Sequence, residues 1–84
     1  MNYTVVFKPS AEREFHDLPQ QIQLLVAREL ASLRTAPCPP GCAKLKGRPG
    51  FRIRVGDWRV IYAVDDDARL VRILAVGNRR DVYR

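Results

Sequence analysis

The sequence predicts an α+β fold of order β-α-α-β-β-β, in which an N-terminal helical hairpin packs on a mostly antiparallel sheet. Three patterns predict it: apolar residues recur at helical spacing between residues 11 and 33, residues 51–55 alternate strictly, and Gly56-Asp57 is a two-residue hairpin turn. The chain has 84 residues, of which 46% are hydrophobic and 29% charged. This is globular composition at the length of one domain, so we expect residues 1–84 to form a single domain.

The first half of the chain predicts one strand and two helices. Residues 3–8 are rich in β-branched and aromatic side chains, which is typical of a strand. Ser10 is a suitable N-cap for a helix that begins at Ala11 and carries acidic residues in its first turn. Leu18-Pro19 ends this helix and begins the next, because proline is tolerated at a first helical position. An apolar stripe on the second helix is formed by Ile22, Leu25, Val26, Leu30 and Leu33.

Residues 35–50 are rich in proline and glycine and are predicted to be a connecting loop, with a short strand around Leu45. Within it, Cys38 and Cys42 flank a Pro-Pro-Gly turn. No metal site is expected, because a zinc site needs more ligands and the single histidine, His16, is distant in sequence and expected at the surface. We expect two free thiols in a reducing compartment, with a redox clip across the turn as the alternative.

The second half of the chain predicts short strands separated by turns. Residues 51–55 alternate apolar and basic side chains, as a half-buried strand does, and residues 70–76 are nearly all apolar, as an interior strand is. The predicted order is strand 51–55, turn Gly56-Asp57, strand 58–64, acidic turn Asp65–Asp67, strand 70–76, a break at Gly77-Asn78, and a last short strand at 82–84.

The turn at Gly56-Asp57 determines which residues of the hairpin share a face. A two-residue loop pairs Val55 with Trp58, Arg54 with Arg59, Ile53 with Val60, and Arg52 with Ile61. The apolar residues on one side then face the helices, and Trp58 is expected in the core with them. The other side is the arginine face, by which we mean Arg52, Arg54 and Arg59.

The predicted placement of Arg54 directly opposite Arg59 needs a physical explanation. Like charges directly across from each other cost about 0.2–1 kcal/mol, so a purely structural sheet would rarely place them there. A phosphate bound between the guanidinium groups would reverse the sign of the interaction, since arginine forks match phosphate oxygens. The alternatives are that nearby carboxylates neutralise the arginines, or that the arginines extend separately into water.

The distribution of charge also favours an anionic partner. The net charge is +6, yet residues 1–42 hold four Lys/Arg and four Asp/Glu, whereas residues 43–84 hold eleven Lys/Arg and five Asp. A neutral half followed by a basic half favours RNA as the target over a generally basic surface. The apolar runs are too short to cross a membrane and no signal peptide is visible, so we expect a cytoplasmic protein with no membrane partner.

Three segments carry a family resemblance. They are Lys44-Leu45-Lys46-Gly47, the hairpin FRIRVGDWRVIYAVDDD at 51–67, and the closing VRILAVGNRRDVY at 71–83. Together with residues 3–18, they resemble the RelE/ParE toxin superfamily, on its RelE side. The resemblance covers nearly the whole chain. The combination of the hairpin with the closing Gly-x-Arg…Val-Tyr is fairly specific, whereas each piece alone is weak.

The resemblance implies the growth-arresting toxin of a type II toxin–antitoxin pair. Such a toxin enters the ribosomal A site and cuts the messenger RNA, by attack of the 2′-hydroxyl on the adjacent phosphate, without a metal or other cofactor. The family's catalytic positions fall on Arg52, Arg54, Arg59, Arg79 and Tyr83, with Arg59 and Arg79 on the scissile phosphate. A family position that binds the ribosome or messenger falls on Lys46, and we expect Lys44, Arg48 and Arg80 to bind RNA or the ribosome with it.

One departure from the RelE pattern leaves the general base open. Arg52 and Arg54 stand where the family's second strand has lysines, and arginine stays protonated, so it is a poor base. It still stabilises a phosphorane and holds the nucleotide in line. Tyr83 is then the best candidate for proton transfer, if neighbouring arginines favour its phenolate. A core plug or a platform on which a base stacks is the alternative for Tyr83.

Two other functions are compatible with the sequence. Relatives on the ParE side poison DNA gyrase without cutting RNA, and kinship of fold does not exclude that activity. A degenerate toxin would bind RNA and leave it uncut. For all three functions the resemblance implies a cognate antitoxin as a partner. For the RNA-cutting toxin it also implies the ribosome and messenger RNA as partners. An antitoxin that shields the arginine face should be acidic there.

Overall fold

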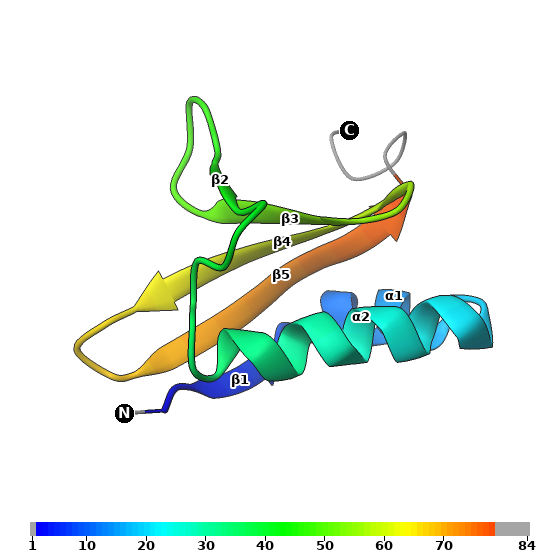
Figure 1. Cartoon of the computed structure of the whole chain (residues 1–84), viewed down its shortest axis with the longest axis horizontal. Helices are drawn as coiled ribbons and strands as arrows, with labels where there is room; N and C mark the ends of the chain where they lie inside the picture. Colours follow the sequence, from blue (N-terminus) through cyan, green and yellow to red (C-terminus); the bar gives the residue numbers. More distant parts are fainter. Residues whose placement is uncertain (1, 79–84) are drawn as a thin grey trace.

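Two layers make up the structure, a five-stranded sheet and a pair of helices that cover one of its faces (Figure 1). The computed structural model describes residues 2–78. The elements are β1 Thr4–Phe7, α1 Pro9–His16, α2 Gln20–Leu33, β2 Ala43–Lys44, β3 Phe51–Val55, β4 Trp58–Asp65 and β5 Leu70–Asn78. The predicted α+β class is confirmed, and the short strand expected around Leu45 is β2, which ends one residue earlier.

The strands lie in the order β1-β5-β4-β3-β2. β1 runs parallel to β5, and every other neighbouring pair is antiparallel. β5 therefore has a partner on each side, which confirms the interior position predicted from its apolar residues. The predicted break at Gly77-Asn78 is wrong, because β4 begins early enough to pair Gly77 with Arg59 and Asn78 with Trp58. The last predicted strand, 82–84, lies outside the described residues.

The hairpin register is confirmed at each predicted pair, from Val55 opposite Trp58 to Arg52 opposite Ile61. Gly56 has a φ of +62°, the left-handed conformation that a primed two-residue turn requires and that glycine adopts without steric cost. A bulge between Ile61 and Tyr62 shifts the pairing of β4 with β5. The bulge lies past the arginine pair, so it leaves the register there unchanged.

The helix starts differ from the prediction. α1 begins at Pro9, with Lys8 as N-cap, and no side chain caps it, so the expected role of Ser10 is wrong. The physical reason is that proline has the φ of a first helical turn and no N–H to satisfy, and it therefore starts the helix itself. Pro19 is the N-cap of α2, not its first residue, and its carbonyl accepts a hydrogen bond from the N–H of Gln23 at 2.9 Å.

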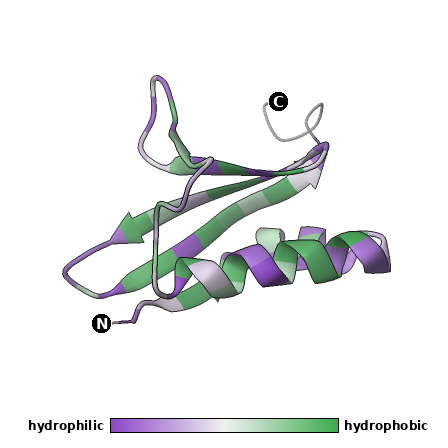
Figure 2. Cartoon of the chain, in the orientation of Figure 1, coloured by the Kyte–Doolittle hydropathy of each residue, from purple (hydrophilic) through white to green (hydrophobic). Residues whose placement is uncertain are grey.

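The core lies between the helices and the sheet, where the hydrophobic residues of both layers gather (Figure 2). Val26 and Leu33 of α2 and Tyr62 and Ile73 of the sheet have no exposed surface. Trp58 is half-buried against this core, as expected. Leu25 is 45% exposed, so its predicted place on the packed stripe is wrong. The buried face of α2 is narrower than the periodicity suggested, because only one strip of a helix can contact a single sheet.

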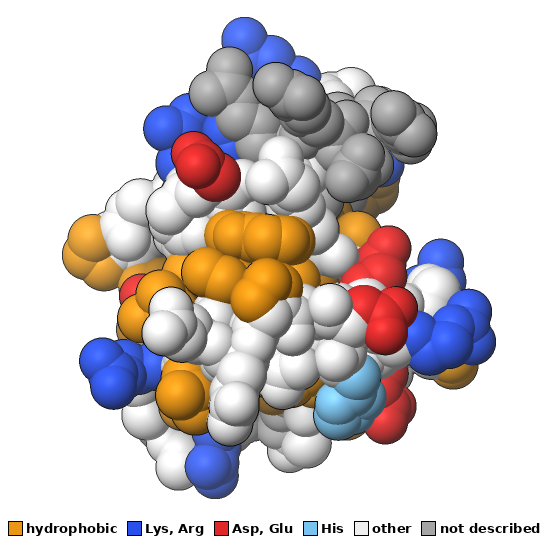
Figure 3. All heavy atoms as spheres, turned by 90° about the vertical axis from the view of Figure 1, so that its right-hand side faces the viewer, with side chains coloured by type: hydrophobic (Ala, Val, Ile, Leu, Met, Phe, Trp, Pro, Cys, Tyr) orange, Lys and Arg blue, Asp and Glu red, His pale blue; other side chains and the backbone are white. Residues whose placement is uncertain are grey.

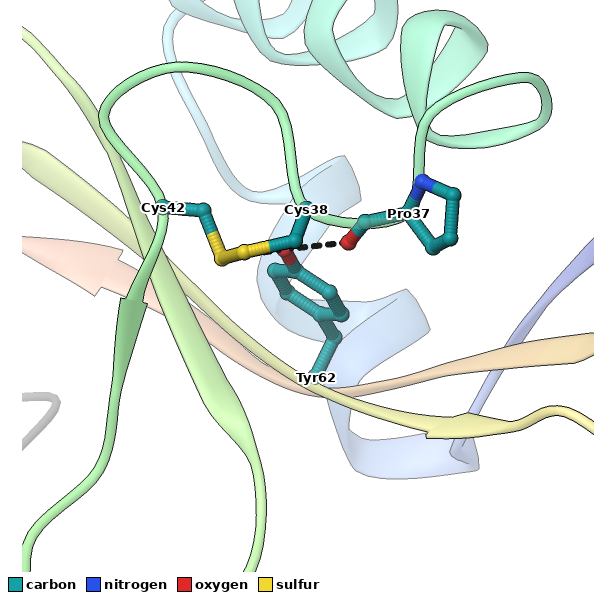
Figure 4. Close-up of a disulfide and its surroundings, with 4 residues drawn as sticks. All are labelled: Pro37, Cys38, Cys42 and Tyr62. Atoms are coloured by element: carbon teal, nitrogen blue, oxygen red, sulfur yellow. Dashed lines mark hydrogen bonds between the residues drawn. A yellow bond between two sulfur atoms is a disulfide. The ribbon is translucent and has the colours of Figure 1, made fainter.

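Cys38 and Cys42 form a disulfide, so the expected pair of free thiols is wrong and the redox clip is the form observed (Figure 4). Their Cα atoms are 5.3 Å apart, within the range that a disulfide can bridge. The turn between them brings them together: Gly41 has a φ of +91°, and the N–H of Cys42 donates to the carbonyl of Pro39 at 2.9 Å.

Tyr62 ties this loop to the middle of the sheet. Its hydroxyl donates to the carbonyl oxygen of Pro37 at 2.7 Å and lies 3.2 Å from the sulfur of Cys42 (Figure 4). Burial raises the pKa of Tyr62 to about 12. The neutral phenol is therefore the form that the folded protein holds.

A second tyrosine fastens the opposite end of the sheet. The hydroxyl of Tyr3 donates to a carboxylate oxygen of Asp66, and this hydrogen bond raises the pKa of Tyr3. The guanidinium of Arg69 lies over the Tyr3 ring, 5.4 Å from its centre. Together these contacts join the start of the chain to the β4–β5 turn.

The longer helix, α2, has 14 residues, against the roughly 20 that cross a bilayer, and neither helix within residues 2–78 qualifies as a membrane span.

Substituting Gly50 by alanine should destabilise the fold more than substituting Gly47. Gly50 has a φ of +120°, and a Cβ there would lie 2.9 Å from the backbone oxygen of Tyr62. We expect Gly50→Ala to lower the free energy of unfolding by about 2–4 kcal/mol, from backbone strain plus the clash. Gly47→Ala, at a φ of +76° with open space around it, should cost about 1–2 kcal/mol. Urea unfolding measures both, and equal losses would contradict the close approach to Tyr62.

Stability should decline at alkaline pH. The pKa of Tyr62 is higher in the folded chain than the ordinary value of 10. The folded state therefore keeps a proton that the unfolded state releases, so the free energy of unfolding is flat below pH 10 and falls from pH 10 towards pH 12. Tyr62→Phe should flatten that fall, as followed by urea unfolding across this range. An unchanged slope in the variant would show that other groups cause it.

Candidate nucleic-acid interface

The arginine face lies on the side of the sheet that the helices leave uncovered. Ile53, Val55 and Val60 belong to the core cluster on the helix side. Because side chains alternate along a strand, Arg52 and Arg54 of β3 and Arg59 of β4 project from the other side. The predicted division of the hairpin into an apolar face and a basic face is therefore confirmed.

Arg54 and Arg59 are directly opposed across the β3–β4 pair. Arg54 is exposed, whereas Arg59 is only 6% exposed. Within residues 2–78, neither forms an ion pair with a carboxylate, and the Nε of Arg59 is buried without a hydrogen-bond partner. The first alternative, in which nearby carboxylates neutralise the arginines, is therefore not found for Arg54 or Arg59 among residues 2–78. The second alternative, in which the arginines extend into water, applies to Arg54 but not to the buried Arg59.

A buried guanidinium without a paired anion is unfavourable, because burial removes the water that would otherwise solvate its charge. A phosphate oxygen is the ligand that arginine matches best, through two parallel N–H···O contacts. Arg54 and Arg59 thus place two positive charges on the same side of the sheet, one on each strand.

Beside this pair lies a basic hollow of about 530 Å³, lined by Lys44, Leu45, Lys46, Arg48 and Arg52. All but one of these residues are basic. The hollow joins three predicted RNA-binding positions, Lys44, Lys46 and Arg48, to one predicted catalytic position, Arg52. It is a concave surface of one charge, which concentrates the field of its cations on an anion that enters it.

The β2–β3 connection shapes the hollow. β2 pairs Ala43 with Arg52 and Lys44 with Phe51. The loop that follows is closed by a hydrogen bond from the N–H of Leu45 to the carbonyl of Gly50, at 3.0 Å. Phe51 stacks on the Tyr62 ring, with ring centres 5.8 Å apart. Arg52 of β3 thus lines one side of the hollow. The other side is lined by Lys44 of the two-residue strand β2 and by the loop that follows it.

Three predicted site residues, Arg79, Arg80 and Tyr83, lie outside the described residues. Their proposed roles at the scissile phosphate, in binding and in proton transfer therefore stay predictions. His16 lies on α1, with its side chain 66% exposed and 4.0 Å from Glu12, as expected of a surface residue.

Sequence reasoning missed one basic residue of the uncovered face. Arg72 of β5 is exposed and pairs with Ala63, two residues along β4 from Ile61, on the same side as Arg59. It borders a smaller hollow of about 80 Å³. The signal was present, since Arg72 is the polar residue between the apolar Val71 and Ile73. The strand as a whole is nearly all apolar, so this single polar position does not stand out in its pattern.

The end of the molecule at which α1 and α2 meet differs in character from the basic hollow. Figure 3 shows the end of the molecule at which α1 and α2 meet, where Lys and Arg side chains lie around the margin and hydrophobic side chains gather across the middle.

Comparison with known proteins shows which family this chain belongs to. The family model described as the ParE toxin of the type II toxin–antitoxin system parDE matches residues 5–83. Toxin RelG of Mycobacterium tuberculosis is 36% identical over 86 residues, covering 100% of this chain and 99% of RelG. The chain belongs to the RelE/ParE family of type II toxins. The resemblance inferred from the sequence is thereby confirmed.

Solved structures of toxin–antitoxin complexes share the fold of this toxin. The RelBE2 complex of M. tuberculosis contains a chain that is 32% identical, with a TM-score of 0.83, over 94% of this toxin and 100% of that chain. The RelE–RelB complex of Pyrococcus horikoshii OT3 contains one that is 26% identical, also with a TM-score of 0.83, over 98% of this toxin and 100% of that chain. The two-layer architecture of the toxin is therefore that of RelE.

Removing one of the opposed arginines should stabilise the toxin. We expect Arg54→Gln to raise the free energy of unfolding by about 0.2–1 kcal/mol at low salt, because it relieves repulsion with Arg59. High salt should shrink the gain, since it screens exposed charges. Arg28→Gln, at an exposed position of α2, is the control and should change stability by less than about 0.5 kcal/mol. A variant less stable than the wild-type toxin at low salt would show that Arg54 makes a stabilising contact.

Proposed function

We propose that the toxin is an endoribonuclease that cuts messenger RNA in the ribosomal A site. The observation that carries the proposal is the opposed pair Arg54 and Arg59 beside the basic hollow. Two cations with no carboxylate partner among residues 2–78 suit the phosphate that is attacked. The hollow suits the backbone of the adjoining nucleotides. The similarity to RelG and to RelE chains supports the same reading.

The reaction is transesterification within the RNA chain. The ribose 2′-hydroxyl attacks the adjacent phosphorus, the bond from phosphorus to the 5′-oxygen breaks, and a cyclic phosphate and a 5′-hydroxyl result. Arg59, held rigidly by its burial, and Arg54 stabilise the extra negative charge on the phosphorane, and Arg52 neutralises the neighbouring phosphate. Fixed cations of this kind need little reorganisation as the charge develops, because the sheet already holds them in place.

Proton transfer needs a group other than these arginines. Arginine remains protonated, so it stabilises charge and does not accept the proton of the 2′-hydroxyl. Tyr83 is the residue that we propose for this role, with Arg79 beside the phosphate and Arg80 on the RNA backbone. A phenol is a slow base near neutral pH, so this role requires neighbouring cations that favour the phenolate.

The proposed partners are the ribosome, its messenger RNA and a cognate antitoxin. The M. tuberculosis and P. horikoshii relatives were each solved as complexes of a toxin with an antitoxin. We propose that the antitoxin of this toxin carries acidic residues opposite the arginine face, because a positive surface of this kind is best covered by negative charge.

Gyrase inhibition is the second candidate. The matching family model is described as a ParE toxin, which favours this function. A toxin of this class would arrest growth with damaged DNA and intact messenger RNA. A third possibility, an RNA-binding module without cleavage, would bind RNA in a salt-dependent manner and leave it uncut.

Mapping of 5′ ends on a messenger RNA whose A-site codon is exposed on purified ribosomes tests the proposal. We expect cleavage in that codon, only with ribosomes present. Arg59→Ala should lower the rate by about 100- to 1,000-fold, the effect of removing one fixed donor to the developing charge. Arg28→Ala removes an equal charge from α2 and should leave the rate unchanged. Absence of cleavage by wild-type toxin that still arrests growth would instead favour gyrase.

The basic hollow should set the salt dependence of RNA binding. Replacing Lys46 and Arg48 by alanine removes two phosphate contacts from the wall of the hollow. The slope of log K against log salt should then become shallower by about 1.4, at about 0.7 for each contact with a single strand. Fluorescence anisotropy with a single-stranded RNA oligonucleotide measures it. An equal change in the Arg13→Ala/Arg28→Ala control would mean that net charge, and not the hollow, determines binding.

A further inference from the structure

We propose that Cys38 and Cys42 form a reversible redox-modification site, at which a dithiol reductant opens the disulfide and loosens the basic hollow. The disulfide lies next to β2, the strand that carries one wall of the hollow. The consequence for RNA rests on the proposed function, whereas the redox chemistry of the pair does not. Three observations carry the proposal: the different exposure of the two cysteines, the position of Tyr62, and the chain connection to Lys44.

The two cysteines differ in exposure. Cys38 is exposed, whereas Cys42 is half-buried beneath the loop. A thiolate of the reductant therefore attacks Cys38, the sulfur–sulfur bond breaks, and Cys42 departs as the leaving thiolate. The second thiol of the reductant then attacks its own sulfur in the mixed disulfide and releases Cys38. Two electrons and two protons pass to the pair, and the dithiol becomes a disulfide.

Tyr62 favours Cys42 as the leaving group. Its hydroxyl has one proton and two acceptors within reach, the Pro37 carbonyl at 2.7 Å and the Cys42 sulfur at 3.2 Å (Figure 4). A thiolate is a stronger acceptor than a disulfide sulfur, because hydrogen bonds to ionised groups are stronger than neutral ones. The hydroxyl thus stabilises the departing thiolate of Cys42.

The chain connects this pair directly to the hollow. Cys42 precedes β2, and Lys44, two residues on, lines the hollow. β2 has only two residues paired with β3, so few backbone hydrogen bonds hold it. The disulfide removes freedom from the loop before β2, and its opening returns that freedom to the chain. Reduction should therefore release the β2 wall of the hollow, while β3 and β4 keep the arginine pair in place.

Alkylation followed by mass measurement of the full chain tests the redox site. Without reductant the chain should take up no label, and after dithiothreitol it should take up two, with recovery of the unlabelled form on addition of oxidised glutathione. Reduced glutathione should form its mixed disulfide on Cys38. Full labelling of the folded chain without reductant, or a glutathione adduct on Cys42, would overturn the proposal. Tyr62→Phe should slow reduction, and an unchanged rate would overturn the role given to its hydroxyl.

Amide hydrogen exchange and RNA binding test the coupling. In the reduced toxin the amides of Lys44 and Leu45 should exchange faster, whereas those of Val60 and Ile61 should not change. A single-stranded RNA oligonucleotide should bind about tenfold more weakly, which is the loss expected from one hydrogen bond to a charged group. The Cys38→Ser/Cys42→Ser double variant should match the reduced toxin under oxidising conditions. Equal exchange in both redox states would overturn the coupling.

The experiments distinguish a failure of the proposed RNA-cutting function from a failure of the proposed redox site. If neither redox state binds or cuts RNA, the proposed function fails, yet the exchange of the Lys44 and Leu45 amides still decides whether the disulfide controls β2. If both states bind RNA equally while exchange differs, the hollow is not the RNA-binding surface and the regulatory consequence is overturned.

Discussion

The register of the β3–β4 hairpin is the constraint on which the rest of the structure depends. Side chains alternate along a strand, so a shift of one residue would place Arg54 and Arg59 in the core and Ile53 and Val60 in water. The turn at Gly56-Asp57 excludes that shift, since its two residues allow one pairing and Gly56 supplies the left-handed conformation it requires. The buried apolar face supports the same register, because its residues pack against both helices.

This constraint explains why the fold tolerates two opposed cations. The energy lost by repulsion at Arg54 and Arg59 is about 1 kcal/mol or less, whereas burial of one large apolar side chain contributes about 1.5–3 kcal/mol. The core side of the hairpin contains several such residues. Packing on one face therefore holds in place an arrangement of charges that the other face would not adopt by itself.

The features of the fold that depend on residues close together in the sequence could be predicted from it. The hairpin pairs, the two faces and the helical hairpin follow from a turn, an alternation and a period, and each was read correctly from the sequence. The disulfide and the burial of Arg59 were not, because they depend on which distant segments meet. The prediction of free thiols at Cys38 and Cys42 rests on cellular compartment, whereas the turn at Gly41 and the hydrogen bond from Tyr62 to Pro37 hold this loop in the conformation that brings them together. The grouping of Lys44, Lys46 and Arg48 with Arg52 required the β2–β3 pairing, which a two-residue strand hardly marks in the sequence.

The parallel pairing of β1 with β5 has a consequence for biosynthesis. Thr4–Phe7 leave the ribosome well before their partners, Leu70–Ile73, because more than sixty residues separate the two segments along the chain. The sheet cannot close until both are available, since contacts of such long sequence separation form only after the intervening chain has been made. A nascent chain that stops before β5 has no partner for β1 and no second neighbour for β4. The β3–β4 hairpin that carries the arginine face therefore stands in a complete sheet only after residues 70–78 have been made.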